Sequence, residues 1–325
     1  MFGFGNAKAP AFDPAEGHPL VREGVAHIAA RAWDELLALY EKQGPSDRYH
    51  FVQGLGALSQ LDDDLPTAFD NPHLMTIVGG IRVGWAWRHR GGGMGEQVNG
   101  VNASNMIRCL RTAEGMLEAV GEAAPDDTTA IAWHIRLEMG LNGDDNVLTR
   151  LLSRAQRSTE TNIFTALNHL TLVSPKWHGS IEQMWSAANG YASRPRNAAW
   201  ISLAARAHIE EWLYCTGMTK DSAVRDAYLP KLTDPGFRAF IGEMDGMFWK
   251  ALESAPMSGS EGVVAHNNFA ALLVMLNAID RARPHIERIG PCFTLIPWYY
   301  AQYRDNPMVW FNEVRRRASL PPLRG

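Results

Sequence analysis

The chain has 325 residues, with 31 lysines and arginines against 35 aspartates and glutamates, which gives a formal net charge of −4. This balance argues against a general nucleic-acid-binding protein, which needs a basic face to displace counterions. Hydrophobic residues make up 46% of the chain and charged residues 20%, so global disorder is excluded as well. We therefore expect a folded protein whose partner is not a nucleic acid.

The sequence carries no sign of export or of a membrane anchor. Cys109, Cys215 and Cys292 are far apart and odd in number, which fits neither a disulfide framework nor a CxxC metal site. The stretch 1–13 lacks the charged start and long apolar run of a signal peptide. The most apolar run, 269–276, is far shorter than the roughly twenty residues of a membrane span. We therefore expect a cytoplasmic protein with no membrane partner.

Helical periodicity begins near the N-terminus. Apolar residues recur at steps of three and four through 20–43, which predicts a single amphipathic helix. Pro45 ends this helix, because proline lacks an amide hydrogen and disfavours helix in the residue before it. Ser46 and Asp47 then offer an N-cap for a second helix. A further helix is predicted over 72–87, with a proline at its favoured first position.

The remaining chain continues in the same way. We divide it into an extended N-terminal segment (1–18), an N-terminal helical region (19–122), a helical-repeat domain (123–318) and a tail (319–325). No stretch shows the period-two alternation of strands bounded by hairpin turns. In the second and third parts, further helices are expected near 102–120, 126–140, 144–157, 160–173, 180–192, 198–217, 220–229, 235–254, 261–278, 280–289 and 306–317. The sequence therefore predicts an all-α fold.

Short helices joined by tight breaks indicate antiparallel helix pairs. Three consecutive pairs begin near Asp126, Thr161 and Asn197, a step of about 35 residues that is typical of two-helix repeats. The first helix of each pair carries a histidine near its middle, at His134, His169 and His208. We therefore predict that the pairs stack as an α-solenoid. One interpretation places these histidines in its groove; the alternative, which is more usual for a histidine on an apolar helix face, is a hydrogen-bonded residue of the core or of the contact between repeats.

Several segments resemble known helical repeats. The W-x2-L-x3-Y spacing in 33–40 and the helix pair in 268–289 resemble the tetratricopeptide repeat. Within 168–184, the residues Pro175, Lys176, Trp177, Gly179 and Ser180 form a motif P-K-W-x-G-S. This motif is similar to the signature of a bacterial helical-repeat family whose domain has no assigned function, although His178 stands where that family usually has glycine. The resemblance spans about 133–290 and implies a tetratricopeptide-like array, but no reaction.

The motif also makes physical sense as a joint between two helices. Pro175 stops the preceding helix, and Trp177 can pack back over the joint. Gly179 permits a turn that other residues resist. Ser180 can cap the helix that begins at Ile181. We therefore expect a structural role for these residues.

Pairs of residues that could bind a metal are present but incomplete. His208 and Glu211 share a helix face, and so do His134 and Glu138, as metal ligands do in helix bundles. No Glu-x-x-His motif accompanies them, and the acidic run 62–64 lacks the D-D-x-x-D spacing of a metal-dependent cyclase. We expect ordinary pairing along a helix face and assign no metal and no cofactor.

Aromatic and basic residues gather near the C-terminus and suggest a contact surface. The candidates are Trp298, Tyr299, Tyr300, Arg304 and Trp310. Aromatic residues and arginine are enriched at interfaces. The alternative is a terminal helix that closes the array, because repeat arrays need atypical end caps.

For function, we predict a non-enzymatic helical-repeat protein that binds a protein or peptide partner. The first alternative is an all-α enzyme, either a hydrolase or a metal-dependent cyclase. It requires at least two carboxylates that converge in one deep cavity with shifted pKa values. The second alternative is a regulatory module that binds a small ligand in the groove.

Overall fold

The computed structural model describes residues 12–60, 64–91, 98–141, 143–177, 179–193, 198–301 and 307–323. Its regular elements are α1 (Val21–Ala30), α2 (Trp33–Glu41), α3 (Pro45–Leu58), α4 (Pro72–Arg90), α5 (Gly100–Ala123), α6 (Thr128–Leu141), α7 (Asp145–Arg157), α8 (Ile163–Leu172), α9 (Ile181–Ala192), α10 (Ala198–Leu213), the π-helix η2 (Tyr214–Met218), α11 (Ser222–Tyr228), the 3-10 helix η3 (Leu229–Thr233), α12 (Pro235–Ser254), α13 (Gly259–Met275), α14 (Ile279–Ile289), α15 (Leu295–Ala301) and α16 (Pro307–Arg317). All of them are helical, which confirms the all-α prediction for the described residues. None of these helices is both long and apolar enough to span a bilayer.

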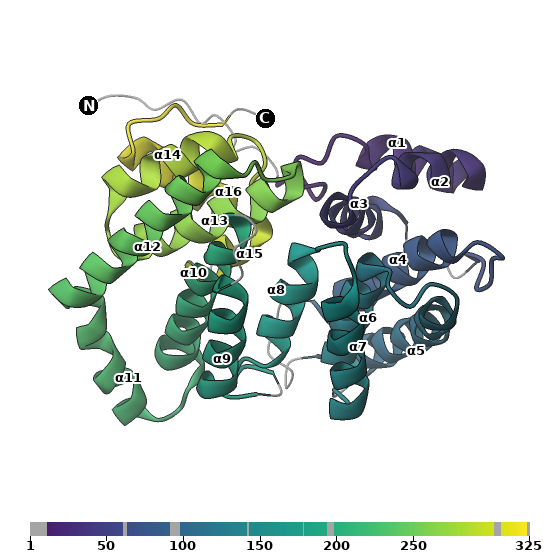
Figure 1. Cartoon of the computed structure of the whole chain (residues 1–325), viewed down its shortest axis with the longest axis horizontal. Coiled ribbons are helices and arrows are strands. Elements are labelled where there is room, and N and C mark those ends of the chain that lie inside the picture. Colours follow the sequence, from purple (N-terminus) through teal and green to yellow (C-terminus); the bar gives the residue numbers. More distant parts are fainter. Residues whose placement is uncertain are drawn as a thin grey trace.

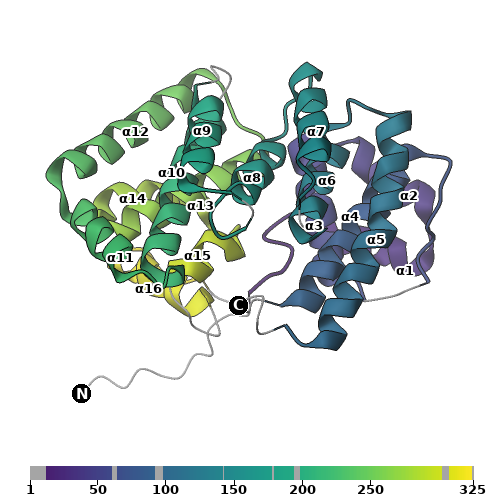
Figure 2. The same ribbon diagram turned by 90° about the horizontal axis from the view of Figure 1, so that it is seen from below.

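The helices gather in two halves (Figures 1 and 2). Helices α1–α7 lie on one side, α9–α16 on the other, and α8 lies between them. Helix α10 takes part in both apolar cores: Leu203 belongs to the first, while Ala198 and Ile209 belong to the second. Most of its side chains are buried, as expected of a helix that is covered on all sides. The first core includes residues on both sides of position 123, where α5 ends and where we expected the helical-repeat domain to begin.

The stretch 20–43 forms two helices where the sequence predicted one. Arg31 adopts a left-handed conformation (φ 56°), and its amide donates to the carbonyl oxygens of His27 and Ile28. This geometry closes the C-terminus of α1, and α2 begins at Trp33. The prediction was wrong because such a cap usually contains glycine or asparagine, and arginine gives no comparable signal.

Ser46 and Asp47 do not cap α3 as predicted. Gly44 precedes the helix instead, and Pro45 occupies its first position. The Ser46 hydroxyl accepts the amide of Ile163 at 3.2 Å, which ties α3 to the beginning of α8. The Asp47 carboxylate accepts the amide of Ser260 at 2.9 Å, which ties α3 to the beginning of α13 in the other half. Residues that looked like local caps therefore join distant helices.

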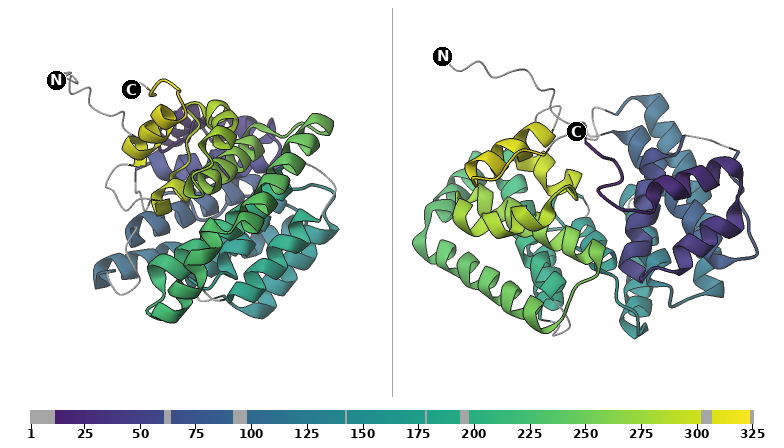
Figure 3. Two further views of the ribbon diagram at one scale, coloured as in Figure 1. Left: turned by 90° about the vertical axis from the view of Figure 1, so that its left-hand side faces the viewer. Right: turned by 90° about the horizontal axis from the view of Figure 1, so that it is seen from above.

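The described part of the N-terminal segment, 12–18, runs between the two halves (Figure 3). The Phe12 ring meets that of Phe293 edge-on at 5.9 Å. One carboxylate oxygen of Glu16 accepts the amide of Leu295 at 2.9 Å, and the other accepts Nε2 of Gln53 at 3.0 Å. Because Leu295 begins α15 and Gln53 lies on α3, Glu16 connects the halves directly.

Candidate functional site

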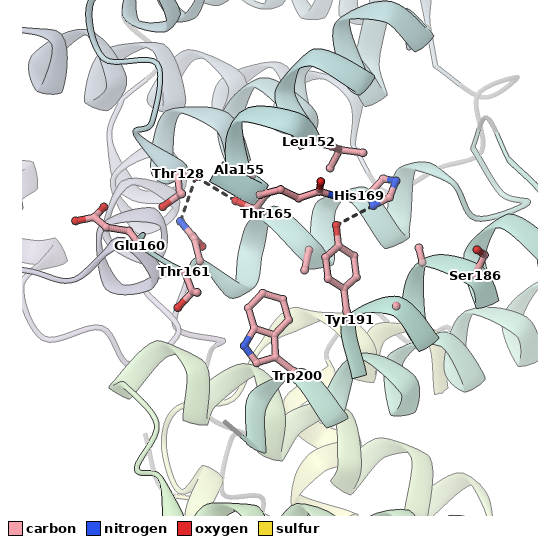
Figure 4. Close-up of a pocket in the computed structure, with 15 residues that line it drawn as sticks. Thr128, Leu152, Ala155, Glu160, Thr161, Thr165, His169, Ser186, Tyr191 and Trp200 are labelled. Carbon is pink, nitrogen blue, oxygen red and sulfur yellow. Dashed lines mark hydrogen bonds between the residues drawn. The ribbon is translucent and has the colours of Figure 1, made fainter. Parts of the chain in front are cut away.

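A pocket of about 190 Å³ opens where consecutive helix pairs meet (Figure 4). Its walls come from the beginning of α6, from α7, from the loop that precedes α8, and from α8, α9 and α10. The side chains that matter below are Thr128, Thr165, His169, Tyr191 and Trp200. They come from four helices, so only the stacking of the pairs brings them together.

Hydrogen bonds to neighbouring helices hold the floor of the pocket. Asn162 caps α8: its side-chain oxygen accepts the amide of Phe164 at 2.9 Å. Its Nδ2 donates to the carbonyl oxygen of Pro45 at 3.1 Å, at the beginning of α3. The Thr165 hydroxyl donates to the carbonyl oxygen of Thr128 at 3.1 Å. These bonds fix the floor before any ligand arrives, which lowers the entropic cost of binding.

The side chains of His169 and Tyr191 meet in the wall of the pocket. Nδ1 of His169 and the hydroxyl of Tyr191 are 2.9 Å apart and share a hydrogen bond. Burial lowers the pKa of His169 to about 4, so its imidazole is neutral at pH 7. The Tyr191 ring stacks on that of Trp200, with 5.6 Å between ring centres and 24° between planes. Both residues are buried, so the two rings support this side of the pocket from behind.

One hydroxyl of the lining is buried without a hydrogen bond. Thr128 is only 2% exposed, and its Oγ1 finds no partner among the described residues. A buried polar group without a partner costs free energy, but this oxygen is itself inaccessible to a ligand in the pocket. The lining contains no lysine or arginine, and its one carboxylate, on Glu160, points away from the cavity in Figure 4.

Of the three histidines considered as groove candidates, only His169 lines this pocket. His134 is buried on α6, and its Nε2 lies 3.5 Å from Glu138. His208 is buried on α10 between the rings of Trp185 and Phe237, at 4.5 and 5.1 Å. The three histidines occupy equivalent positions in the sequence repeat, but they do not lie on one surface of the protein.

The two helix-face pairs do not develop into a metal site. Both carboxylate oxygens of Glu211 accept hydrogen bonds from Lys231, at 3.0 and 3.1 Å, so His208 faces an acid that is already paired. Within the described parts of the chain, no group of three or more histidine, cysteine or acidic side chains could hold a metal ion.

The P-K-W-x-G-S residues connect α8 and α9 to the rest of the molecule. The Trp177 ring meets that of Trp87 edge-on at 5.3 Å. A Cβ atom on Gly179 would overlap the carbonyl oxygen of Val173, so the chain passes too close for any side chain. The Ser180 hydroxyl accepts the amide of Gln183 at 3.2 Å and caps α9. His178 lies outside the described residues.

Lys176 of the same motif enters a buried ionic cluster. Its Nζ lies 2.6 Å from one carboxylate oxygen of Glu210, and Nε of Arg206 donates to the other at 2.8 Å. Lys176 also donates to the hydroxyl of Tyr300 at 2.5 Å. Burial opposes ionisation of Glu210, but the two cations outweigh it and lower its pKa. The cluster therefore joins the α8–α9 link to α10 and α15.

The predicted C-terminal contact surface is only partly exposed. Trp298 is wholly buried, and its indole N–H donates to Asn267 at 2.7 Å, so we correct its assignment to the surface. Its ring packs against Phe311 of α16, at 4.9 Å. Tyr299 and Tyr300 are half-buried. Trp310 is also half-buried and packs against the second core, and Arg304 lies outside the described residues.

Sequence reasoning missed two buried histidine clusters at a distance from the pocket. In one, Nε2 of His285 shares a hydrogen bond with Asp245, and its Nδ1 shares another with His266, both at 2.9 Å. In the other, Nδ1 of His50 lies 3.1 Å from the Ser260 hydroxyl. These partners come from different helices, so no spacing in the sequence could reveal them.

Comparison of the chain with protein-family models, with curated proteins and with solved structures finds no match. The functional argument therefore rests on the geometry of the pocket itself.

Proposed function

We propose that the chain is a non-enzymatic helical-repeat protein that binds a peptide segment of a protein partner. In this proposal the pairs α6–α7, α8–α9 and α10–α11 stack as a tetratricopeptide-like array. The resemblance of the P-K-W-x-G-S motif to a helical-repeat family favours this arrangement. Repeat arrays bind their partners along an extended face, where neighbouring repeats meet.

The observation that carries the proposal is the pocket at the meeting point of these pairs. Its volume of about 190 Å³ lies below the range of about 300–1,000 Å³ that is usual for cofactors and drug-sized ligands. A single side chain of a longer partner fits such a space better. The hydrogen-bonded floor supplies the pre-organised surroundings that anchor residues use at interfaces.

Gly190 offers a direct test, because it lines the pocket and a Cβ atom there would meet nothing within 4 Å. Random peptides displayed on phage are selected on the wild-type protein, and a selected peptide is titrated by calorimetry. Gly190→Phe should weaken binding at least tenfold, because the new ring fills the pocket. Gly115→Phe is the matched control: Gly115 also lies on a helix with open space around it, outside the pocket. Equal affinity of both variants would contradict the proposal.

A hydrolase remains the second candidate, on one observation. His50 lies between Ser260 and Glu16. Its Nδ1 is 3.1 Å from Ser260 Oγ, and its Nε2 is 3.7 Å from the Glu16 carboxylate. Ser260 is only 2% exposed and does not line the pocket, which is why we rank this function second. Labelling of Ser260 by a fluorophosphonate probe would favour the hydrolase, whereas an unlabelled serine would count against it.

A further inference from the structure

The outer side of α12 carries apolar side chains that are open to solvent. The inner side of this helix is buried, and its Phe248 ring packs against that of Phe269 on α13, at 4.7 Å. The outer side faces away from the molecule, and α12 lies in front of the other helices in the left view of Figure 3. On this side Phe240 is 52% exposed and Met247 is 62% exposed. Large apolar side chains that are exposed on one face mark a surface for interaction.

The outward residues of α12 follow the spacing of a coiled-coil seam. Along this face, steps of four and three residues alternate, as they do between the a and d positions of a two-stranded coiled coil. The exposed residues at these steps are Gly236, Phe240, Glu243, Met247, Lys250 and Ser254. A second helix can therefore lie along this face over its whole length.

The charges in the middle of this face select the second helix. Glu243 and Lys250 are exposed, and neither side chain has a hydrogen bond or an ion pair with a described residue. Two helical turns, or about 10.5 Å, separate them. An antiparallel copy of α12 places its own Lys250 opposite Glu243 and its own Glu243 opposite Lys250. A parallel copy instead places each charge opposite a like charge, which is unfavourable. The face is therefore complementary to itself in the antiparallel direction.

This pairing also fixes the register of the two helices. The two-fold axis passes between Gly246 and Met247, midway between the two charges. The symmetry brings Phe240 and Met247 of both chains to the same side of the helix pair, where they shield one another from water. On the other side, the space beside Gly246 is open, since a Cβ atom there would meet nothing within 4 Å, so the two backbones can approach closely.

We propose that the protein forms a two-fold symmetric dimer in which α12 packs antiparallel against α12 of a second copy. Apolar contacts stabilise this dimer, while the pairs between Glu243 and Lys250 set its direction and register, as polar seam residues do in coiled coils. No residue that lines the pocket belongs to α12, so this inference is independent of the proposed function.

Charge reversal tests the dimer and its direction together, by sedimentation equilibrium of the full chain at 10 to 100 µM. The wild type should be dimeric at 100 µM. Glu243→Lys and Lys250→Glu each place like charges opposite one another, so each variant alone should dimerise at least tenfold more weakly than the wild type. An equal mixture of the two variants should form dimers again, because every facing pair then has opposite charges.

Glu118→Lys is the matched control, because Glu118 is an exposed glutamate on α5 and its reversal should leave the dimer intact. A wild type that is monomeric at 100 µM would overturn the inference and leave the α12 face to a different partner. Reversed variants that each dimerise as well as the wild type, or that do not associate when mixed, would overturn it as well.

A cysteine beside the two-fold axis provides a second measurement. Met247→Cys places the two new thiols next to each other, so mild oxidation at 10 µM should produce a disulfide-linked dimer. Val101→Cys is the control, because Val101 is 71% exposed but lies on α5. The wild type gives the background from Cys292, the native cysteine that is not fully buried. Cross-linking of Met247→Cys that does not exceed that of Val101→Cys would contradict the proposed axis.

Discussion

At the residue scale, Glu16 lies in surroundings that disfavour its ionised form. Burial raises its pKa to about 7, against the opposing effects of the Leu295 amide, Arg136 and Gln53. Nε2 of His50, which is buried and has no hydrogen bond to a described residue, lies 3.7 Å from its carboxylate. This environment could not be predicted from the sequence, because an isolated glutamate near a turn is normally exposed.

The raised pKa predicts the sign of a pH effect on stability. Between pH 4.5 and 7 the folded state holds a proton on Glu16 that the unfolded state has lost, so this group destabilises the fold increasingly as the pH rises. The cost above pH 7 is about 3 kcal/mol at most. Glu16→Gln should therefore match the wild type at pH 5 and exceed its free energy of unfolding by about 1–3 kcal/mol at pH 8. Urea unfolding at both pH values measures this, and a variant that is less stable at pH 8 would contradict it.

At the scale of elements, the link between α8 and α9 combines a steric constraint with an ionic one. The positions of Pro175, Gly179 and Ser180 in the sequence suggested a joint, since each has a local backbone preference. Lys176 offered no such signal, because its partners lie on α10 and α15. Local chemistry can thus be predicted from spacing, whereas pairing across the fold cannot.

Two glycine variants test the steric constraint. Gly179→Ala should lower the free energy of unfolding by about 2–4 kcal/mol, because the new methyl group overlaps the Val173 carbonyl. Gly190→Ala places the same methyl group in open space within α9 and should raise stability by about 0.5–1 kcal/mol. Denaturant unfolding of both variants decides the point. Similar effects from the two substitutions would show that the close approach at Gly179 is unimportant.

The geometry of the ionic cluster predicts which of two substitutions destabilises the fold more. Glu210→Gln leaves Lys176 and Arg206 buried without the carboxylate and should cost about 3–5 kcal/mol. Lys176→Met should cost less, because Glu210 keeps its bonds to Arg206. Thermal and urea unfolding at pH 7 compare the two variants. A larger loss from Lys176→Met would contradict the assignment of Glu210 as the centre of the cluster.

At the scale of the whole molecule, buried histidines make the fold sensitive to acid. Burial lowers the pKa values of His50, His208 and His266 to about 3. Below pH 6.5 these histidines therefore bind protons in the unfolded state but stay neutral in the folded state. Each of these histidines lowers the free energy of unfolding by about 1.4 kcal/mol for every pH unit below 6.5, and the three together lower it by about 4 kcal/mol per pH unit. Since domains are stable by only about 5–15 kcal/mol, we expect cooperative unfolding between pH 5 and 4.

Circular dichroism against pH tests this expectation. His208→Met keeps an apolar side chain among Trp185 and Phe237 but cannot bind a proton, so its acid midpoint should lie below that of the wild type. A wild-type protein that stays folded at pH 3.5 would contradict the account.

The helical class of the molecule could be predicted from periodicity, because an apolar stripe is a local property of each helix. The split between α1 and α2 could not, since it depends on the conformation of Arg31. For the site, the repeat pattern pointed to His169. Thr128 and Tyr191 escaped notice, because only the packing of several helices brings them to one cavity.

The most direct test of the central claim is to locate a bound peptide. A peptide selected on the wild-type protein is added to isotopically labelled protein, and shifts in the NMR spectrum identify the contact surface. We predict that the indole N–H of Trp200 and the backbone amides around Thr165 and Gly190 move together, and that Gly190→Phe abolishes the shifts. Shifts confined to the C-terminal aromatic residues around Trp310, with the pocket unchanged, would contradict the account.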